Sequence, residues 1–186
     1  MWKKVAVFVS LFAFVACGDG GGPTQLAKVA KKPNASDIGK MCNIQVARAS
    51  AQIDAAADAG FEEMSRLGVT KKDVKAARAV REKASKEYDA GARRCCDMLK
   101  KEAGRLSKTQ RGYLYGQIVA FDYKTLDQKQ TRDVEALLTR TRDDLTFGEL
   151  REIEALRKGG KRCQDNVSAT ISRRATSEIS NILKKY

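Results

Sequence analysis

Apolar positions recur every three or four residues along most of the chain, and no segment alternates apolar and polar residues as a strand does. The clearest stripe lies near the C-terminus, where an apolar or small residue returns at every fourth position. It comprises Cys163, Val167, Ile171, Ala175, Ile179 and Leu183. This spacing places all of them on one side of a helix, so the pattern predicts an all-α protein.

Capping residues and glycines divide these stripes into about five to six helices. A Ser, Thr or Asp before an apolar run favours a helix start, because its side-chain oxygen accepts a hydrogen bond from an unpaired backbone N–H. The predicted starts are Ser36 or Asp37, Thr70 with Asp73, Ser107, and Thr146 with Glu149. The predicted ends are Gly60, Gly68 and the pair Gly159 and Gly160, and Gly91 is a point at which a long helix over 71–105 can break. The resulting architecture is a helical bundle.

Residues 1–16 form a separate hydrophobic segment. Lys3 and Lys4 precede a run of apolar and small residues from Val5 to Ala16, which is the layout of a secretory signal. The run is shorter than the roughly 20 residues that a membrane-spanning helix needs. We therefore expect the segment to be removed as a signal peptide.

The residues around the end of this run carry a resemblance to a known class. Phe14, Val15 and Ala16 stand directly before Cys17, and this sequence resembles the lipobox of bacterial lipoproteins, which usually carries Leu or another aliphatic residue where Phe14 stands. The resemblance covers residues 1–22 and implies cleavage before Cys17, lipid modification of Cys17 and attachment to a membrane.

The mature chain then divides into a linker and a domain. Residues 17–36 begin with a Gly-rich stretch typical of a flexible tether, and residues 37–186 are long enough for a single helical domain. An Asp directly after the lipidated Cys resembles an inner-membrane retention signal, and here Gly18 stands at that position, so the outer membrane is favoured over the inner membrane. Asp19, one residue later, leaves both membranes possible. We expect the domain to lie in the periplasm or at the cell surface.

Four cysteines remain besides Cys17, namely Cys42, Cys95, Cys96 and Cys163. An even number in an oxidising compartment predicts two disulfides. A bond between the neighbours Cys95 and Cys96 fits disulfide geometry poorly, so Cys42 and Cys163 each pair with one of them, and either assignment is open. Adjacent thiolates also lack the spacing of a zinc site, and we expect no metal and no other cofactor.

The mature chain is strongly basic. Removal of Lys3 and Lys4 leaves 34 basic and 23 acidic residues, a formal charge of +11. Such an excess attracts polyanions, which outside a bacterial cytoplasm include lipid headgroups, lipopolysaccharide, cell-wall polymers and extracellular DNA. The candidate anion-binding residues are basic pairs at Arg93 and Arg94, Lys100 and Lys101, and Arg173 and Arg174, with a further pair at Lys184 and Lys185. These pairs form one surface only if folding aligns their helices.

Evidence for catalysis is weak. The chain has no His, which is the side chain best suited to proton transfer near neutral pH, and it has no phosphate-binding loop or nucleophile motif. The remaining candidates for hydrolysis or cation binding are carboxylates at Asp143, Asp144, Glu149, Glu152 and Glu154. They surround a helix start, where carboxylates stabilise the helix dipole. We therefore expect the protein not to be an enzyme.

Together these patterns favour a noncatalytic, membrane-anchored envelope lipoprotein that binds or scaffolds another envelope macromolecule. The expected partners are the membrane, through the lipid, and an envelope protein or a polyanionic surface polymer, but not nucleic acid. An inhibitor or exclusion-type lipoprotein that acts on a foreign protein is the alternative. A carboxylate-dependent periplasmic hydrolase is a third hypothesis.

Overall fold

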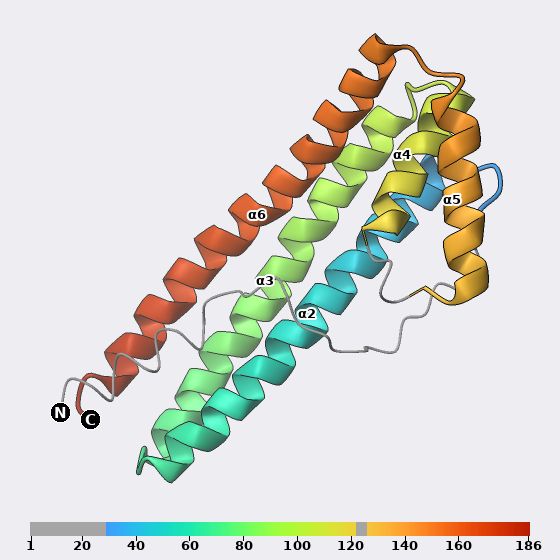
Figure 1. Cartoon of the computed structure of the whole chain (residues 1–186). Coiled ribbons are helices and arrows are strands. Elements are labelled where there is room, and N and C mark those ends of the chain that lie inside the picture. Colours follow the sequence, from blue (N-terminus) through green and yellow to red (C-terminus); the bar gives the residue numbers. More distant parts are fainter. Residues whose placement is uncertain (1–28, 122–125) are drawn as a thin grey trace. The chain divides into compact units, whose positions relative to one another are not determined.

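The computed structural model describes residues 29–121 and 126–186, so the predicted signal and Cys17 lie outside the described residues. Within them every regular element is a helix (Figure 1). The helices are α2 (Ala35–Arg66), α3 (Lys71–Ala103), α4 (Lys108–Ala120), α5 (Gln128–Arg142) and α6 (Phe147–Leu183). Two disulfides join them, so the predicted all-α, disulfide-clamped bundle is confirmed.

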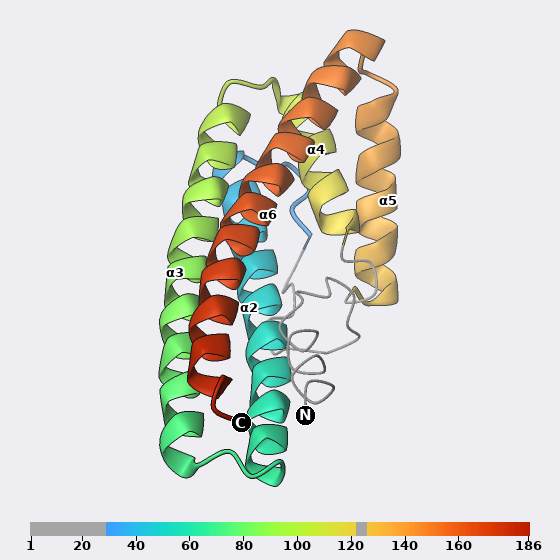
Figure 2. The same ribbon diagram turned by 90° about the vertical axis from the view of Figure 1, so that its left-hand side faces the viewer.

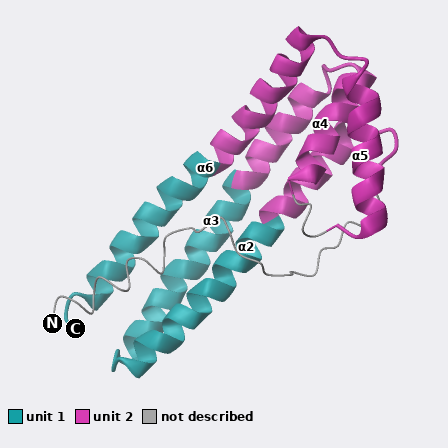
Figure 3. Cartoon of the chain, in the orientation of Figure 1, with its two compact units in different colours: residues 1–20, 47–91, 165–186 teal, residues 21–46, 92–164 magenta. Residues whose placement is uncertain are grey.

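The chain divides into two compact units (Figure 3). In its described part, unit 1 consists of residues 47–91 and 165–186, which belong to α2, α3 and α6. Unit 2 consists of residues 29–46, 92–121 and 126–164, which include all of α4 and α5. The single domain over 37–186 stays a prediction.

Unit 1 is built around one apolar core from α2, α3 and α6. Its buried members are Ala57, Phe61, Met64, Val69, Val74, Ala77, Ile179 and Leu183. The turn between α2 and α3 depends on Gly68, whose φ of 85° is a left-handed conformation that favours glycine. The Val69 N–H donates to the Met64 carbonyl and the Gly68 N–H to the Ser65 carbonyl, a Schellman pattern that ends α2. The predicted stop at Gly68 is confirmed.

Polar pairs set the register of α2 against α3 in unit 1. Arg81 lies 2.9 Å from Asp54, and Arg78 lies 2.6 Å from Asp58. The residue numbers rise along α2, from Asp54 to Asp58, while those of their partners fall along α3, from Arg81 to Arg78. The two helices are therefore antiparallel. The Arg81 side chain is largely buried, and this burial lowers the pKa of its guanidinium.

The start of α3 is tied to the last residues of the chain within unit 1. The Thr70 hydroxyl donates to Asp73 over 2.5 Å, which is the predicted pairing. Asp73 also accepts from Lys185 Nζ at 2.8 Å and from the Tyr186 hydroxyl at 2.5 Å, and that hydroxyl accepts from the Thr70 N–H. The hydrogen bond from Lys185, then those from Thr70 and Tyr186, hold the pKa of Asp73 well below its ordinary value.

Unit 2 draws buried side chains from all five helices. Those with almost no exposed surface include Ile38, Cys96, Leu114, Val134 and Ile153. Helices α4 and α5 lie side by side in Figure 1 and again in the turned view of Figure 2. Two glycines of α4 allow this approach, because a Cβ on Gly112 would lie 2.8 Å from the Thr141 side chain and one on Gly116 would lie 2.8 Å from Leu138.

Two predicted helix ends, at Gly60 and at the pair Gly159 and Gly160, are wrong, and of the two possibilities left open at Gly91 the structure shows the continuous helix. Helix α2 runs through Gly60 to Arg66, α3 runs through Gly91, and α6 runs without a break through Gly159 and Gly160. Glycine weakens a helix by only about 1 kcal/mol, which tertiary packing readily offsets. At Gly91 the glycine is needed for packing, since a Cβ there would lie 2.6 Å from Val167 of α6.

The predicted helix starts are mostly confirmed. Ser107 forms a capping box with Gln110, and Thr146 forms one with Glu149. Neither Ser36 nor Asp37 caps α2: the Asn34 side chain accepts hydrogen bonds from the N–H groups of both residues, and the Asp37 carboxylate accepts from the Asn34 N–H. Asn34 is thus the cap, and the prediction was displaced by two to three residues. Of the helices in the described ranges, none has the length and apolar character needed to span a bilayer.

Candidate anion-binding surface

The two disulfides lie in unit 2 and fix α3 to two other helices. Cys42 of α2 bonds to Cys96 with Cα atoms 5.5 Å apart, and Cys163 of α6 bonds to Cys95 with Cα atoms 5.8 Å apart. Successive residues of a helix point about 100° apart, so the adjacent Cys95 and Cys96 can each bond to a different helix. The structure thereby selects one of the two pairings that the sequence left open.

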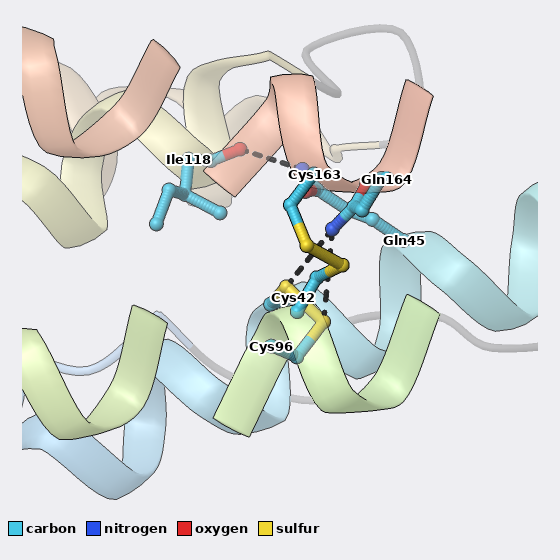
Figure 4. The surroundings of a disulfide bond; sticks show 7 residues. Cys42, Gln45, Cys96, Ile118, Cys163 and Gln164 are labelled. Carbon is cyan, nitrogen blue, oxygen red and sulfur yellow. Dashed lines mark hydrogen bonds between the residues drawn. A yellow bond between two sulfur atoms is a disulfide. The ribbon is translucent and has the colours of Figure 1, made fainter. Parts of the chain in front are cut away.

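The amide side chains of Gln164 and Gln45 lie near this clamp (Figure 4). The Gln164 amide donates to Cys42 Sγ at 3.2 Å and to Cys96 Sγ at 3.7 Å, so a residue of α6 contacts the bond between α2 and α3. Gln45 Nε2 donates to the Ile118 carbonyl at 2.8 Å and ties α2 to α4. All four of these sulfur atoms are bonded in disulfides, so the clamp has a structural role: it fixes the positions of α2, α3 and α6 in unit 2.

The charge of the protein is concentrated in unit 2. Its described residues include 19 Lys and Arg against 11 Asp and Glu, a formal charge of +8. The described residues of unit 1 include 13 basic and 10 acidic residues, a formal charge of +3. Residues 92–121 carry most of the excess, with seven basic and two acidic side chains. The positive charge is therefore greater in unit 2 than in unit 1.

Four exposed basic residues on α2 and α3 of unit 2 form what we call the basic face: Lys40, Arg93, Lys100 and Lys101. Lys100 and Lys101 follow Arg93 by seven and eight residues, which is about two helical turns, so the three residues lie on one side of α3. None of the four forms a salt bridge within the described part of the chain. Asp97 is the acidic residue on this stretch of α3, and it leaves a clear positive excess.

Close packing between α2 and α3 holds Lys100 in this face. A Cβ on Gly39 would lie 3.1 to 3.3 Å from the Cδ, Cβ and Cγ atoms of Lys100. The Lys100 stem therefore lies directly on the α2 backbone while the residue as a whole stays exposed. Lys40 directly follows Gly39, so the α2 and α3 members of the face are neighbours. The Cys42–Cys96 bond fixes the same pair of helices.

The remaining predicted basic residues are placed differently. Arg173 and Arg174 belong to unit 1, whereas Arg93, Arg94, Lys100 and Lys101 belong to unit 2. Arg174 forms salt bridges with Glu87 and with Glu178, and the Arg173 guanidinium donates to the Ala169 carbonyl. Lys185 is bound to Asp73. Arg94 also has an interaction partner, so it is not counted in the basic face.

Of the carboxylates weighed for catalysis, Glu149 and Glu154 have structural partners. Glu149 completes the cap of α6, and the N–H and hydroxyl of Thr146 lower its pKa. Glu154 binds Arg157 and Lys158 within α6, and the hydrogen bond from Arg157 lowers the pKa of Glu154 to about 2. Across residues 29–121 and 126–186, no group of His, Cys, Asp and Glu is arranged to hold a metal ion.

One member of the basic face, Lys40, was missed by sequence reasoning. Lys40 has no basic neighbour in the sequence, and it lies near Lys100 because Gly39 packs against the Lys100 side chain, a contact between distant parts of the chain. Of the aromatic side chains near residue 115, Tyr113 and Tyr115 are buried and Phe121 is 68% exposed. The Tyr115 hydroxyl accepts a hydrogen bond from the Ala30 N–H.

Comparison with protein-family models, curated proteins and solved structures finds no match to this chain.

Proposed function

We propose that this chain is a noncatalytic lipoprotein of the bacterial envelope, anchored through Cys17, which binds a polyanionic envelope component through the basic face of unit 2. The observation that carries the proposal is the set of basic residues with no salt bridge within the described residues, at Lys40, Arg93, Lys100 and Lys101. The anchor itself rests on the sequence around Cys17.

The contrast within the molecule supports this use of the basic face. In unit 1, Arg78, Arg81 and Arg174 pair with carboxylates on other helices, so part of the charge there contributes to folding. Other basic residues of unit 1, such as Lys75 and Lys83, are exposed on α3. In unit 2, disulfides join the helices through Cys42 and Cys163. Charges that are not needed for internal pairing are available to an external anion.

The anchor is tested by intact-mass analysis of the protein purified from its native host, before and after reduction and alkylation. We expect a chain that begins at Cys17, carries acyl groups, and takes up alkyl groups on four thiols only after reduction. An unlipidated chain would contradict the membrane-anchored part of the proposal.

Anion binding is tested with inorganic polyphosphate as the probe. A face variant, Arg93→Gln with Lys100→Gln and Lys101→Gln, removes three charges from unit 2. A matched control, Lys75→Gln with Lys83→Gln and Lys86→Gln, removes three charges from exposed positions of α3 in unit 1.

We expect the face variant to bind polyphosphate roughly tenfold or more weakly at low salt, with a shallower dependence of log K on log salt concentration, because fewer counterions are released. The control should bind almost as the wild type does. Equal losses in both variants would show that net charge alone, and not the basic face, attracts the anion.

A further inference from the structure

We propose that the anion bound by the basic face is the phospholipid headgroup layer of the same membrane that holds the lipid anchor. Unit 2 would thus dock on the membrane surface with α3 against the headgroups. This inference rests on the proposed function, since it requires both the anchor at Cys17 and an anion-binding face. It adds the identity of the partner and the side of the molecule that meets it.

The chain enters the folded protein in unit 2. Val29 is 4% exposed, the Ala30 N–H donates to the Tyr115 hydroxyl at 3.3 Å, and the Lys31 carbonyl accepts from Arg140 at 3.1 Å. These contacts with α4 and α5 fix the position from which the N-terminal segment leaves unit 2.

The length of that segment limits how far unit 2 can move from the membrane. Cys17 precedes Val29 by 12 residues, and a chain of this length spans at most about 40 Å. A lipid on Cys17 therefore keeps the entry point of unit 2 within about 40 Å of the headgroups. Tethering of this kind raises the effective concentration of the surface to about the millimolar range, so weak charge interactions are sufficient for docking.

The unit to which the tether connects is also the unit that carries the charge. The formal charge of its described residues is +8, whereas that of unit 1 is +3. Each basic residue near an anionic membrane surface raises the affinity about fivefold. Charge and tether thus direct the same part of the chain to the headgroups.

An exposed apolar side chain distinguishes a lipid surface from a soluble polymer. Met98 lies on α3 with 55% of its surface exposed. Arg94 precedes it by four residues and Lys101 follows it by three, so both adjoin it on the helix. Glu102 follows Met98 by four residues, but its carboxylate is paired with Arg105. A combination of exposed apolar and basic side chains is typical of a helix that lies in a membrane interface. A polyphosphate chain offers no apolar region for Met98 to enter, whereas a lipid layer does.

Docking is tested with the lipidated protein reconstituted into two kinds of vesicle, one of phosphatidylcholine alone and one that also contains phosphatidylglycerol. An amine-reactive reagent labels the exposed lysines, and mass spectrometry gives the rate at each site. Lys40, Lys100 and Lys101 report on the basic face, while Lys83 and Lys86 of unit 1 serve as internal controls. Soluble polyphosphate, added to the neutral vesicles, is the competing anion.

We expect labelling of the basic face to slow about fivefold or more on the anionic vesicles only, and to recover at high salt. Met98→Gln should reverse much of this protection and leave polyphosphate binding unchanged. The matched variant Leu67→Gln, at a 44% exposed apolar residue of unit 1, should preserve the protection.

Two other outcomes overturn the inference in different ways. Protection by polyphosphate without protection by anionic vesicles would exclude lipid docking and leave the proposed function intact. Equal labelling of the basic face under all conditions would overturn the inference and anion binding together. Loss of protection in both Met98→Gln and Leu67→Gln would remove the assigned role of Met98 and with it the choice of a lipid surface.

Discussion

The two units use similar helices but stabilise them by different means. Unit 1 joins its helices by polar contacts, among them Arg81 with Asp54 and Lys185 with Asp73. Unit 2 contains both disulfides, while the salt bridges of Arg105 and Arg157 join residues only three apart in the sequence. A covalent link needs no surface charge, so unit 2 can keep basic residues exposed without losing its tertiary links. The difference shows how a cross-linked bundle can separate stability from surface chemistry.

The largest effect should follow from removal of the disulfide between α3 and α6 by Cys95→Ala with Cys163→Ala. The bond closes a loop with a sequence separation of 68 residues. Its loss should lower the free energy of unfolding by about 4 kcal/mol in the chain-entropy model. Urea unfolding gives this value, and hydrogen exchange should show faster opening of α6 around residues 147–164.

A matched change in unit 1 controls for the loss of noncovalent links between helices. Ser50→Ala with Ser85→Ala removes a contact of 3.4 Å between the two hydroxyls and the hydrogen bond that Ser85 donates to Asp54, both of which join α2 to α3, and should cost about 1–2 kcal/mol. If the two double variants lose similar stability, the distinction between covalent and polar linkage is wrong.

Overpacking at Gly91 should have the next largest effect, and it tests the packing within unit 1. The Cβ of Gly91→Ala would lie 2.6 Å from Val167 Cγ1, which should cost about 1–3 kcal/mol as the helices shift apart. Val167→Ala in the same chain should recover part of that loss. An absence of recovery in urea unfolding would show that α3 and α6 do not meet at this position.

Acid should act on unit 1 through Asp73. Its pKa is lowered in the folded protein, so its contribution is complete above its ordinary pKa of 3.8 and is lost as the pH falls below that value. Asp73→Asn should therefore destabilise the protein at neutral pH and flatten the fall in stability toward about pH 3. Urea unfolding at a series of pH values measures both effects.

Glu154→Gln in unit 2 is the comparison for Asp73→Asn. Glu154 also has a lowered pKa, but its partners Arg157 and Lys158 lie on the same helix. We expect a smaller loss at neutral pH, because no contact between chain segments is broken. A larger loss than that of Asp73→Asn would contradict the view that polar links between segments support unit 1.

Local signals explain what could be predicted from the sequence. The caps at Ser107 and Thr146 depend on side chains three residues apart, and both are confirmed. Asp127 forms a further box with Gln130 that was missed, although the same spacing of an acceptor and a Gln was present. The two possible disulfide pairings followed from the adjacency of Cys95 and Cys96, but the choice between them required the positions of α2 and α6.

Long-range contacts account for what could not be predicted. The tie between Asp73 and Tyr186 spans a sequence separation of 113 residues, and no local pattern marks it. Lys40 joins the basic face only because Gly39 packs against Lys100. Glycines were the main source of error, since a glycine that breaks a helix and one that permits close packing look alike in a sequence.

The smallest expected effect separates these two kinds of glycine within α6 and α3. Nothing lies within 4 Å of a Cβ built on Gly159, and the position is helical and exposed. Gly159→Ala should therefore raise the free energy of unfolding by about 0.5–1 kcal/mol, because alanine loses less backbone freedom on folding. Urea unfolding of this variant beside Gly91→Ala should give shifts of opposite sign. A loss of stability in Gly159→Ala would mean that α6 needs flexibility at this glycine pair, as the predicted break implied. The continuity of α6 would then depend more on the disulfide of Cys163 than on helix propensity.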